Sequence, residues 1–447
     1  MKLIINKFPP IIEKCEIDLS KKLTLFVGKN NSGKTYVSQL IWAIYDFANY
    51  QSDYWKDDYN VIDFFTSEKS PNYTIEITKE LLEKISDNFS NYLITKKIKK
   101  TFKQEIDIDI NIIFSLKEIK EKIITGGVTG SDDSKLEFTK KHGTFSIDIN
   151  IVNLDKIDIH LDILNKYLES QIIKVLLVDN TIYMPSTRLF LPSFYKYIIS
   201  IEKEFKDDIF NNFDKLDNQN KNFFQSTYTE PVYELIKKLI FDIDTPIKEN
   251  KYLTKLTSLI DGNISIDKSE VLGMADISYT HSSGKKLPMY LSSSMVNQLA
   301  TVYLYFKYWY QEDNSFLLLD EPEMNLHPEK KIEFTRILLD YASSNKLLIA
   351  THSSTLAKSI INYIHLFDLK DKKEDIQNFV EQNDLKMDFN IDLKSNDIGI
   401  YYFNGKTIVS YKKDNNSNIH FGTFTEIEEL QTKQYDYIME ELDSYDS

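Results

Sequence analysis

Cysteine, arginine and glycine are all scarce in this sequence. One cysteine, Cys15, occurs in 447 residues, which excludes a disulfide framework and favours a reducing compartment. The only arginines are Arg188 and Arg336, so lysine carries nearly all of the positive charge. No apolar run approaches the roughly 20 residues of a membrane span, and the N-terminus lacks the pattern of a secretory signal. We therefore expect a cytoplasmic protein with no membrane segment.

The chain is acidic, with a formal net charge of −14 at pH 7. A protein that binds nucleic acid over much of its surface is expected to be basic, so any DNA contact should be local. The candidate for such a contact is one lysine cluster; the alternative is that these lysines form an ordinary solvated helix face, and the acidic balance favours that alternative. The candidate cluster lies in a helix predicted over 79–103 and comprises Lys96, Lys97, Lys99, Lys100 and Lys103.

Two of the 12 glycines stand at a particular spacing in the stretch Gly28–Thr35, GKNNSGKT. The stretch lies between a predicted strand, 23–27, and a predicted helix beginning at Tyr36. This is the context that a phosphate-binding loop of the form G-x-x-x-x-G-K-[ST] requires. Backbone N–H groups and the helix N-terminus would face the phosphates, Lys34 would reach the terminal ones, and Thr35 would ligate Mg²⁺. The predicted nucleotide-binding residues are Gly28, Lys29, Asn30, Asn31, Ser32, Gly33, Lys34 and Thr35.

Charged side chains follow two further predicted strands. The apolar run 315–319 ends in Asp320 and Glu321, and burying carboxylates there is unfavourable unless they have a partner. Beside a phosphate-binding loop, Asp320 can hold Mg²⁺ and Glu321 can position and deprotonate an attacking water. The strand 346–350 ends just before His352, which can reach the terminal phosphate from the same edge of the sheet.

Two other polar groups are candidates for the same edge. Arg188 follows the strand 181–184, and ligands bind beyond strand ends in open α/β sheets. An ordinary surface arginine is the alternative. Ser292 and Ser293 open a helix, where they either cap its N-terminus or present hydroxyls and N–H groups to a phosphate.

The remaining chain is read from periodicity and turn residues. We expect strands over 106–114, 144–152, 174–178 and 364–368, a flexible loop over 126–133, and helices across 192–259. Near the C-terminus, Asn404-Gly405 predicts a hairpin between 399–403 and 407–411. An acidic amphipathic helix is expected over 425–442.

Five segments, GKNNSGKT, YMPSTR, LSSSM, FLLLDEPEMNLHP and LLIATHSS, occur in this order. Together they resemble the motifs of ATP-binding-cassette ATPases of the SMC and RecF type. The chain looks most like the overcoming-lysogenization-defect (OLD-like) group, including ATPase subunits of anti-phage systems such as PARIS and Septu. The motifs lie within residues 1–50 and 170–370. The resemblance therefore does not cover the insertion between these two parts or the C-terminal tail after residue 370.

The resemblance implies an α/β fold: a P-loop sheet with an antiparallel β subdomain and a helical insertion. It divides the chain into a Walker A part (1–50), a mixed insertion (51–170) and a return strand with a Q-loop-like segment (171–190). A helical arm (191–260), a part with signature, Walker B and switch histidine (261–370), and a C-terminal hairpin and acidic helix (371–447) follow.

The resemblance also assigns roles to residues. Asp320 and Glu321 complete Walker B, 325–328 is the D-loop, and His352 is the switch histidine. Ser292 is the signature serine, which would contact the terminal phosphate held by a second protomer. ATP and Mg²⁺ are therefore the implied cofactors, and a head-to-tail homodimer or a higher oligomer is the implied assembly.

Three departures from the family pattern bear on function. The signature lacks the usual glycine after its serine, so we expect slow hydrolysis. No Q-loop glutamine is evident, and Arg188 stands where it would be. The Toprim nuclease residues of OLD proteins cannot be placed after His352, so we expect that the chain is not itself a nuclease.

The resulting hypothesis is an ATPase whose dimerisation senses infection and controls a separate effector, a nuclease or a toxin, in anti-phage defence. The alternative is a RecF- or SMC-like ATPase that binds DNA directly in repair or chromosome maintenance. A nucleotide-gated scaffold with negligible turnover is a third reading, which the glycine-free signature permits.

Overall fold

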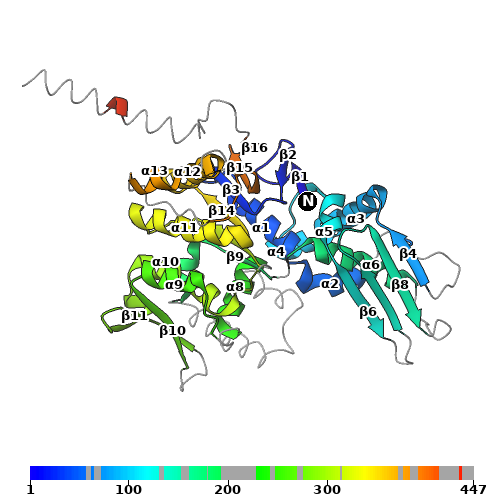
Figure 1. The fold of residues 1–447 in the computed structure, drawn as a ribbon, viewed down its shortest axis with the longest axis horizontal. Coiled ribbons are helices and arrows are strands. Elements are labelled where there is room, and N and C mark those ends of the chain that lie inside the picture. The colour runs from blue at the N-terminus through cyan, green and yellow to red at the C-terminus, as the bar shows by residue number, and fades with distance from the viewer. Residues whose placement is uncertain are drawn as a thin grey trace, which may run out of the picture.

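A six-stranded sheet forms the centre of the computed structural model (Figure 1). The structure describes residues 1–56, 62–64, 72–129, 135–152, 161–178, 180–192, 228–241, 247–268, 275–312, 315–370, 376–382, 391–411 and 432–434. The central strands are, in spatial order, β16 (Ile408–Ser410), β15 (Ile398–Phe403), β3 (Leu23–Gly28), β14 (Lys346–Thr351), β13 (Ser315–Asp320) and β9 (Asn180–Met184).

All neighbouring pairs in this sheet are parallel except β15 with β16. One row across the five parallel strands is entirely apolar, and it consists of Ile398, Leu23, Leu347, Leu317 and Ile182. Because the strands run in the same direction, their carboxyl ends meet at one edge. Thr351 is level with Val27 there, and Asp320 is level with Ala350.

The sheet is buried on both faces, which is why its strands are apolar runs rather than alternating ones. On β3, Leu25 and Val27 belong to one core cluster while Phe26 belongs to the other, as the alternation of side chains along a strand requires. The second cluster holds α1 (Lys34–Tyr45) and much of the insertion. The first holds α10 (Ser294–Leu304), α11 (Pro328–Ser344) and α12 (Ser354–Lys370).

Two antiparallel sheets accompany the insertion, on the right in Figure 1. The smaller one orders β2 (Cys15–Asp18), β1 (Lys2–Lys7) and β5 (Asp109–Ile113), and the larger one orders β4 (Asn72–Glu76), β8 (Ser146–Val152), β7 (Lys135–Lys140) and β6 (Ile124–Thr129). The helices of this region are α2 (Phe47–Lys56), α3 (Lys79–Tyr92), the π-helix η1 (Leu93–Lys97), α4 (Ile98–Phe102), α5 (Leu116–Glu121) and α6 (Leu161–Leu176).

A third antiparallel sheet lies at the lower left of Figure 1, beside α9 and α10. It orders β10 (Gly262–Lys268), β11 (Ala275–His281) and β12 (Lys286–Pro288). The other elements are η3 (Ser186–Phe190), α8 (Glu230–Phe241), α9 (Lys251–Leu259), η6 (Met289–Leu291), the π-helix η7 (Tyr305–Trp309), α13 (Ile376–Gln382) and η8 (Ser395–Asp397). Within the described ranges, no helix has both the length and the apolarity needed to cross a bilayer.

The predicted fold class is confirmed, and so are the strands of the sheet edge and the C-terminal hairpin. Three local predictions are wrong. Residues 174–176 end helix α6, residues 364–368 continue helix α12, and the predicted loop begins inside strand β6. Short apolar runs suit a buried helix as well as a strand, which explains the first two errors.

Gly126 of β6 has a packing reason that the local sequence does not reveal. A Cβ on Gly126 would lie 2.4 Å from Cζ of Phe138, the residue that pairs with Gly126 on β7. The glycine therefore makes room for an aromatic ring across the ladder rather than forming a turn. Most of the acidic helix predicted over 425–442 and the 193–227 part of the helical arm lie outside the described residues.

Candidate functional site

The loop between β3 and α1 carries the geometry of an anion-binding turn. Gly33 has φ of 99° and Asn31 has φ of 59°, both in the left-handed region. A Cβ on Gly33 would also lie 2.7 Å from Cδ of Pro10, so glycine is required twice over at this position. The Ser32 hydroxyl is buried without a hydrogen-bond partner among the described residues, as expected for a group that faces a ligand.

Lys34 is held inside this loop. Its ammonium donates to the carbonyls of Gly28 at 2.8 Å and Lys29 at 2.7 Å, and the residue is only 6% exposed. Burial lowers its pKa, while the nearby carboxylates of Asp320 and Glu321 act in the opposite direction. The lysine is thus a partly desolvated cation held by two loop carbonyls, where an anionic ligand would compensate the burial.

Asp320, at the end of β13, lies directly beside the loop. The Thr35 hydroxyl donates to its Oδ2 at 2.7 Å, and the Tyr183 hydroxyl reaches the same oxygen at 3.3 Å. Burial raises the pKa of this carboxyl, which the Thr35 hydrogen bond and two cations partly offset. A hydroxyl and a carboxylate side by side are the oxygen ligands that Mg²⁺ prefers, so the residues present fit that ion.

Glu321 and His352 form an ion pair at the same edge. The imidazole Nδ1 lies 3.0 Å from Oε1 of Glu321. This hydrogen bond is the main cause that raises the pKa of His352 and lowers the pKa of Glu321. Glu321 therefore carries an ionised carboxylate, restrained by a neighbour whose own charge is titratable.

A second glutamate, Glu323, connects the two loops at this edge of the sheet. Glu323 is 3% exposed, burial raises its pKa, and it accepts a hydrogen bond from the Thr351 hydroxyl. The Thr351 hydroxyl also accepts from the N–H of Ser353 at 2.9 Å. These contacts tie the loop after β13 to the loop after β14, which carries His352.

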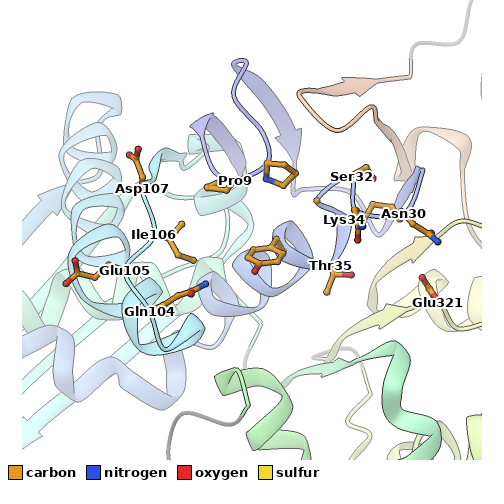
Figure 2. A pocket seen from close by; sticks show the side chains of 14 residues that line it. Pro9, Asn30, Ser32, Lys34, Thr35, Gln104, Glu105, Ile106, Asp107 and Glu321 are labelled. Atoms are coloured by element: carbon orange, nitrogen blue, oxygen red, sulfur yellow. The ribbon is translucent and has the colours of Figure 1, made fainter. Parts of the chain in front are cut away.

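A cleft of about 730 Å³ lies over the phosphate-binding loop, and Figure 2 shows the side chains that line it. One wall is the loop itself with Glu321, and the other is the Gln104–Asp107 segment that leads from α4 into β5. Pro9 and Pro10 close one end. The cleft thus joins the sheet edge to the insertion, and a ligand bound there would touch both.

The structure brings together the loop, Asp320, Glu321 and His352, but not all of the predicted site residues. Ser292 and Ser293 are absent from the described lining of the cleft. Ser293 is exposed at the start of α10, where its side chain accepts from the N–H of Val296 as an N-cap. Ser292 is half-buried and its hydroxyl donates to the carbonyl of Pro288 at 3.4 Å.

Arg188 has partners other than the predicted nucleotide. It is fully buried, and its guanidinium donates to the carbonyls of Asp320 at 2.6 Å, Pro185 at 2.9 Å and Glu321 at 3.1 Å. The alternative of a surface arginine is wrong. Direct contact with a nucleotide stays a prediction that this conformation does not support.

The lysine cluster matches neither of its two predicted roles, a contact with a DNA backbone or an ordinary solvated helix face. Lys97 is 2% exposed and bonds Asp46 at 2.9 Å and Glu230 at 2.7 Å. Lys99 and Lys100 are exposed and also lie beside carboxylates. Since the central lysine is buried and its neighbours are paired, the cluster is neither a free basic patch nor an ordinary solvated face.

Two further polar residues of this edge had no signal strong enough to single them out. Tyr183 stands within the YMPSTR segment, yet its contact with Asp320 depends on the pairing of β9 with β13. Gln298 is a fully buried residue of α10 whose Nε2 donates to the carbonyl of Glu321 at 3.3 Å. No spacing in the sequence connects it with residue 321.

Comparison with known families adds one match of long extent. A model described as "AAA ATPase domain" matches residues 1–357, which includes every residue of the sheet edge described above. A search of curated proteins finds no match.

Solved structures with similar chains include heads of SMC proteins. The SMC head domain from Thermotoga maritima is 13% identical, with a TM-score of 0.30, and 92% of this chain and 98% of that one are covered. The Smc head from Pyrococcus furiosus bound to the C-terminal domain of ScpA is 10% identical, with a TM-score of 0.36 and coverages of 96% and 98%. A further SmcHead bound to the C-winged helix domain of ScpA is 12% identical, with a TM-score of 0.38 and coverages of 94% and 99%.

Proposed function

The chain belongs to the AAA ATPase domain family, and from this premise we propose that it binds ATP with Mg²⁺ in the cleft over Gly28–Thr35 and hydrolyses it with Glu321 as the base. The observation that carries the proposal is the convergence of three separate strand ends. The phosphate-binding loop, Asp320 with Glu321, and His352 follow β3, β13 and β14, which are adjacent in the sheet.

Each residue has a part that its position supports. The loop N–H groups and Lys34 bind the phosphates, and Thr35 with Asp320 would hold Mg²⁺, which supplies charge neutralisation on the phosphates when bound. Glu321 accepts a proton from the attacking water. His352 restrains the Glu321 carboxylate until the imidazole turns toward the terminal phosphate, which leaves Glu321 free to act.

The direct test is Glu321→Gln, which keeps the shape and removes the base. We expect turnover to fall by about 10²-fold or more, since general bases contribute in this range, while ATP binding persists. Glu333→Gln is a matched control, because Glu333 lies on α11 and pairs only with Lys330 at 2.9 Å among its described partners. Equal turnover in the parent and Glu321→Gln would contradict the assignment and favour the scaffold reading.

We further propose that ATP joins two chains head-to-tail through Ser292 and Ser293, and that this homodimer controls a separate effector in anti-phage defence. The support is the resemblance of the motifs and the position of both serines at an exposed helix start. Light scattering of Glu321→Gln with ATP should show a dimer that Ser293→Arg abolishes. A monomer under both conditions would overturn this proposal without touching the ATPase assignment.

Direct DNA binding is the alternative function, and the lysine cluster was its support. Lys97 is buried between two carboxylates, which leaves less free charge than the sequence predicts. The test is binding of duplex DNA in the presence of ATP. Binding that weakens steeply with added salt and is lost in Lys99→Glu would restore this alternative. Binding that is absent at low salt would remove it.

A further inference from the structure

The main chain of Glu321 has an uncommon conformation for a glutamate. Its φ is 47°, in the left-handed region that residues with a Cβ rarely occupy. Such a conformation persists only where surrounding contacts impose it, and it gathers at functional sites. Here it follows the last residue of β13 and determines the direction in which the Glu321 carboxylate leaves the sheet.

Several hydrogen bonds hold this residue in place. Its N–H donates to the carbonyl of Ala350 at 2.8 Å, on the neighbouring strand. Its carbonyl accepts from Nη2 of Arg188 at 3.1 Å, from Nε2 of Gln298 at 3.3 Å and from the N–H of Met324 at 3.3 Å. Both side-chain donors come from elements other than β13, namely η3 and α10.

Arg188 and Gln298 are unusual for buried polar residues. Both are 0% exposed, and Nε of Arg188 and Oε1 of Gln298 have no hydrogen-bond partner among the described residues. Burial lowers the pKa of Arg188 to about 10, and within the described residues its guanidinium donates to three carbonyls rather than to a carboxylate. An incompletely satisfied buried cation destabilises a fold, so its retention points to a role in the site.

We propose that Arg188 and Gln298 are positioning residues, which hold the Glu321 main chain so that its carboxylate faces the attacking water. The inference rests on the proposed role of Glu321 as the base. Arg188 fixes two successive carbonyls, those of Asp320 and Glu321, and so keeps the proposed base and the metal-side carboxylate in a constant relation. Gln298 extends this link to α10, whose N-cap residue is Ser293.

The position of Gln298 connects the two halves of the proposed ATP site within one chain. It lies on the same helix as Ser293, little more than one turn further along. If α10 moves when Ser293 contacts the partner's nucleotide, the hydrogen bond from Gln298 to the Glu321 carbonyl changes with it. This gives the proposed dimer a physical route for coupling association to hydrolysis.

The test measures turnover, ATP affinity and melting temperature for Gln298→Met, Arg188→Lys and Arg188→Met. We expect kcat to fall by about tenfold or more, because misplacing a reacting group by about 1 Å has effects of this order, while the Kd for ATP changes less than about twofold. Arg188→Lys should keep more activity than Arg188→Met. Lys307→Met is a matched control, since Lys307 is also a buried cation bonded to a carbonyl, that of Ile264 at 2.7 Å.

A double-mutant comparison separates positioning from general destabilisation. If Gln298 acts through Glu321, adding Gln298→Met to Glu321→Gln lowers the residual turnover no further. Normal kcat in both Gln298→Met and Arg188→Lys, or full additivity with Glu321→Gln, would overturn the inference. Unchanged turnover in Glu321→Gln alone would instead refute the proposed function. If Arg188→Met melts early, Gln298→Met and Arg188→Lys still decide the result.

Discussion

Glu169 should make the insertion less stable as pH rises, and replacing it by glutamine should remove that dependence. The residue lies on α6 and is fully buried. Its Oε1 accepts from the Tyr54 hydroxyl at 2.9 Å and from Asn88 at 3.1 Å, on α2 and α3. Its Oε2 has no partner within the described parts of the chain. One carboxyl thus joins three helices of the insertion.

The magnitude follows from linkage between protonation and folding. Burial raises the Glu169 pKa from 4.5 to about 7, against the hydrogen bonds from Asn88 and Tyr54. An acid with a raised pKa stabilises the fold while it is protonated, and this stability is lost as pH rises from about 4.5 to about 7. A gap of this size corresponds to about 3 kcal/mol. Above about pH 7 the loss is complete and the dependence on Glu169 levels off.

The assay compares Glu169→Gln with the parent at pH 5 and pH 8. Because a chain of this length need not unfold in one step, amide hydrogen exchange in α6 reports the local free energy of opening. We expect the variant to match the parent within about 1 kcal/mol at pH 5 and to be more stable by about 2–3 kcal/mol at pH 8. Glu121→Gln, which changes an exposed carboxylate on α5, is the control. The same difference at both pH values would refute the reasoning.

Three other outcomes follow from the site and its surroundings. Lys97→Met should destabilise the protein by about 3–5 kcal/mol, because it removes the buried cation closest to the Asp46 and Glu230 carboxylates, whereas Lys99→Met should cost less than about 1 kcal/mol; urea denaturation measures both, and equal effects would contradict the burial argument. Gly33→Ala should abolish ATP binding in a fluorescent-nucleotide titration, since the new methyl group would meet Pro10 in a backbone conformation that alanine rarely adopts; normal affinity would show that the loop rearranges. Turnover at saturating ATP should rise as pH passes the pKa of His352, which the hydrogen bond with Glu321 raises above its usual value, because the imidazolium charge and its ion pair with Glu321 are lost only there; the pH profile of His352→Gln should be flatter, and an unchanged profile would remove His352 from this role.

The phosphate-binding loop was predictable from sequence because its geometry depends on consecutive residues. The glycine spacing and the flanking strand and helix are all local, and β3 and α1 have nearly the predicted bounds. The buried parallel strands were likewise predictable, since uninterrupted apolar runs ending in charge are uncommon elsewhere. The match to the AAA ATPase domain family over residues 1–357 agrees with both.

The local sequence pattern predicted the wrong element where the same stretch is compatible with two kinds of secondary structure. The apolar residues at 174–178 and 364–368 fit a strand, but the adjoining turns of α6 and α12 continue through or into them. The glycines of β6 suggested a loop. The actual reason for Gly126 is the ring of Phe138, which occupies the space beside it and belongs to another strand. These outcomes depend on neighbours that a short window of sequence does not contain.

By itself, then, the sequence determined a nucleotide-binding loop and the charged ends of two partner strands. Only the tertiary structure decided what surrounds them: Tyr183 beside Asp320, and Arg188 with Gln298 on the carbonyl of Glu321. The physical reason is range. Backbone turns are set by neighbouring residues, whereas contacts between residues 23 to 137 positions apart are set by strand order and by how each helix packs on the sheet.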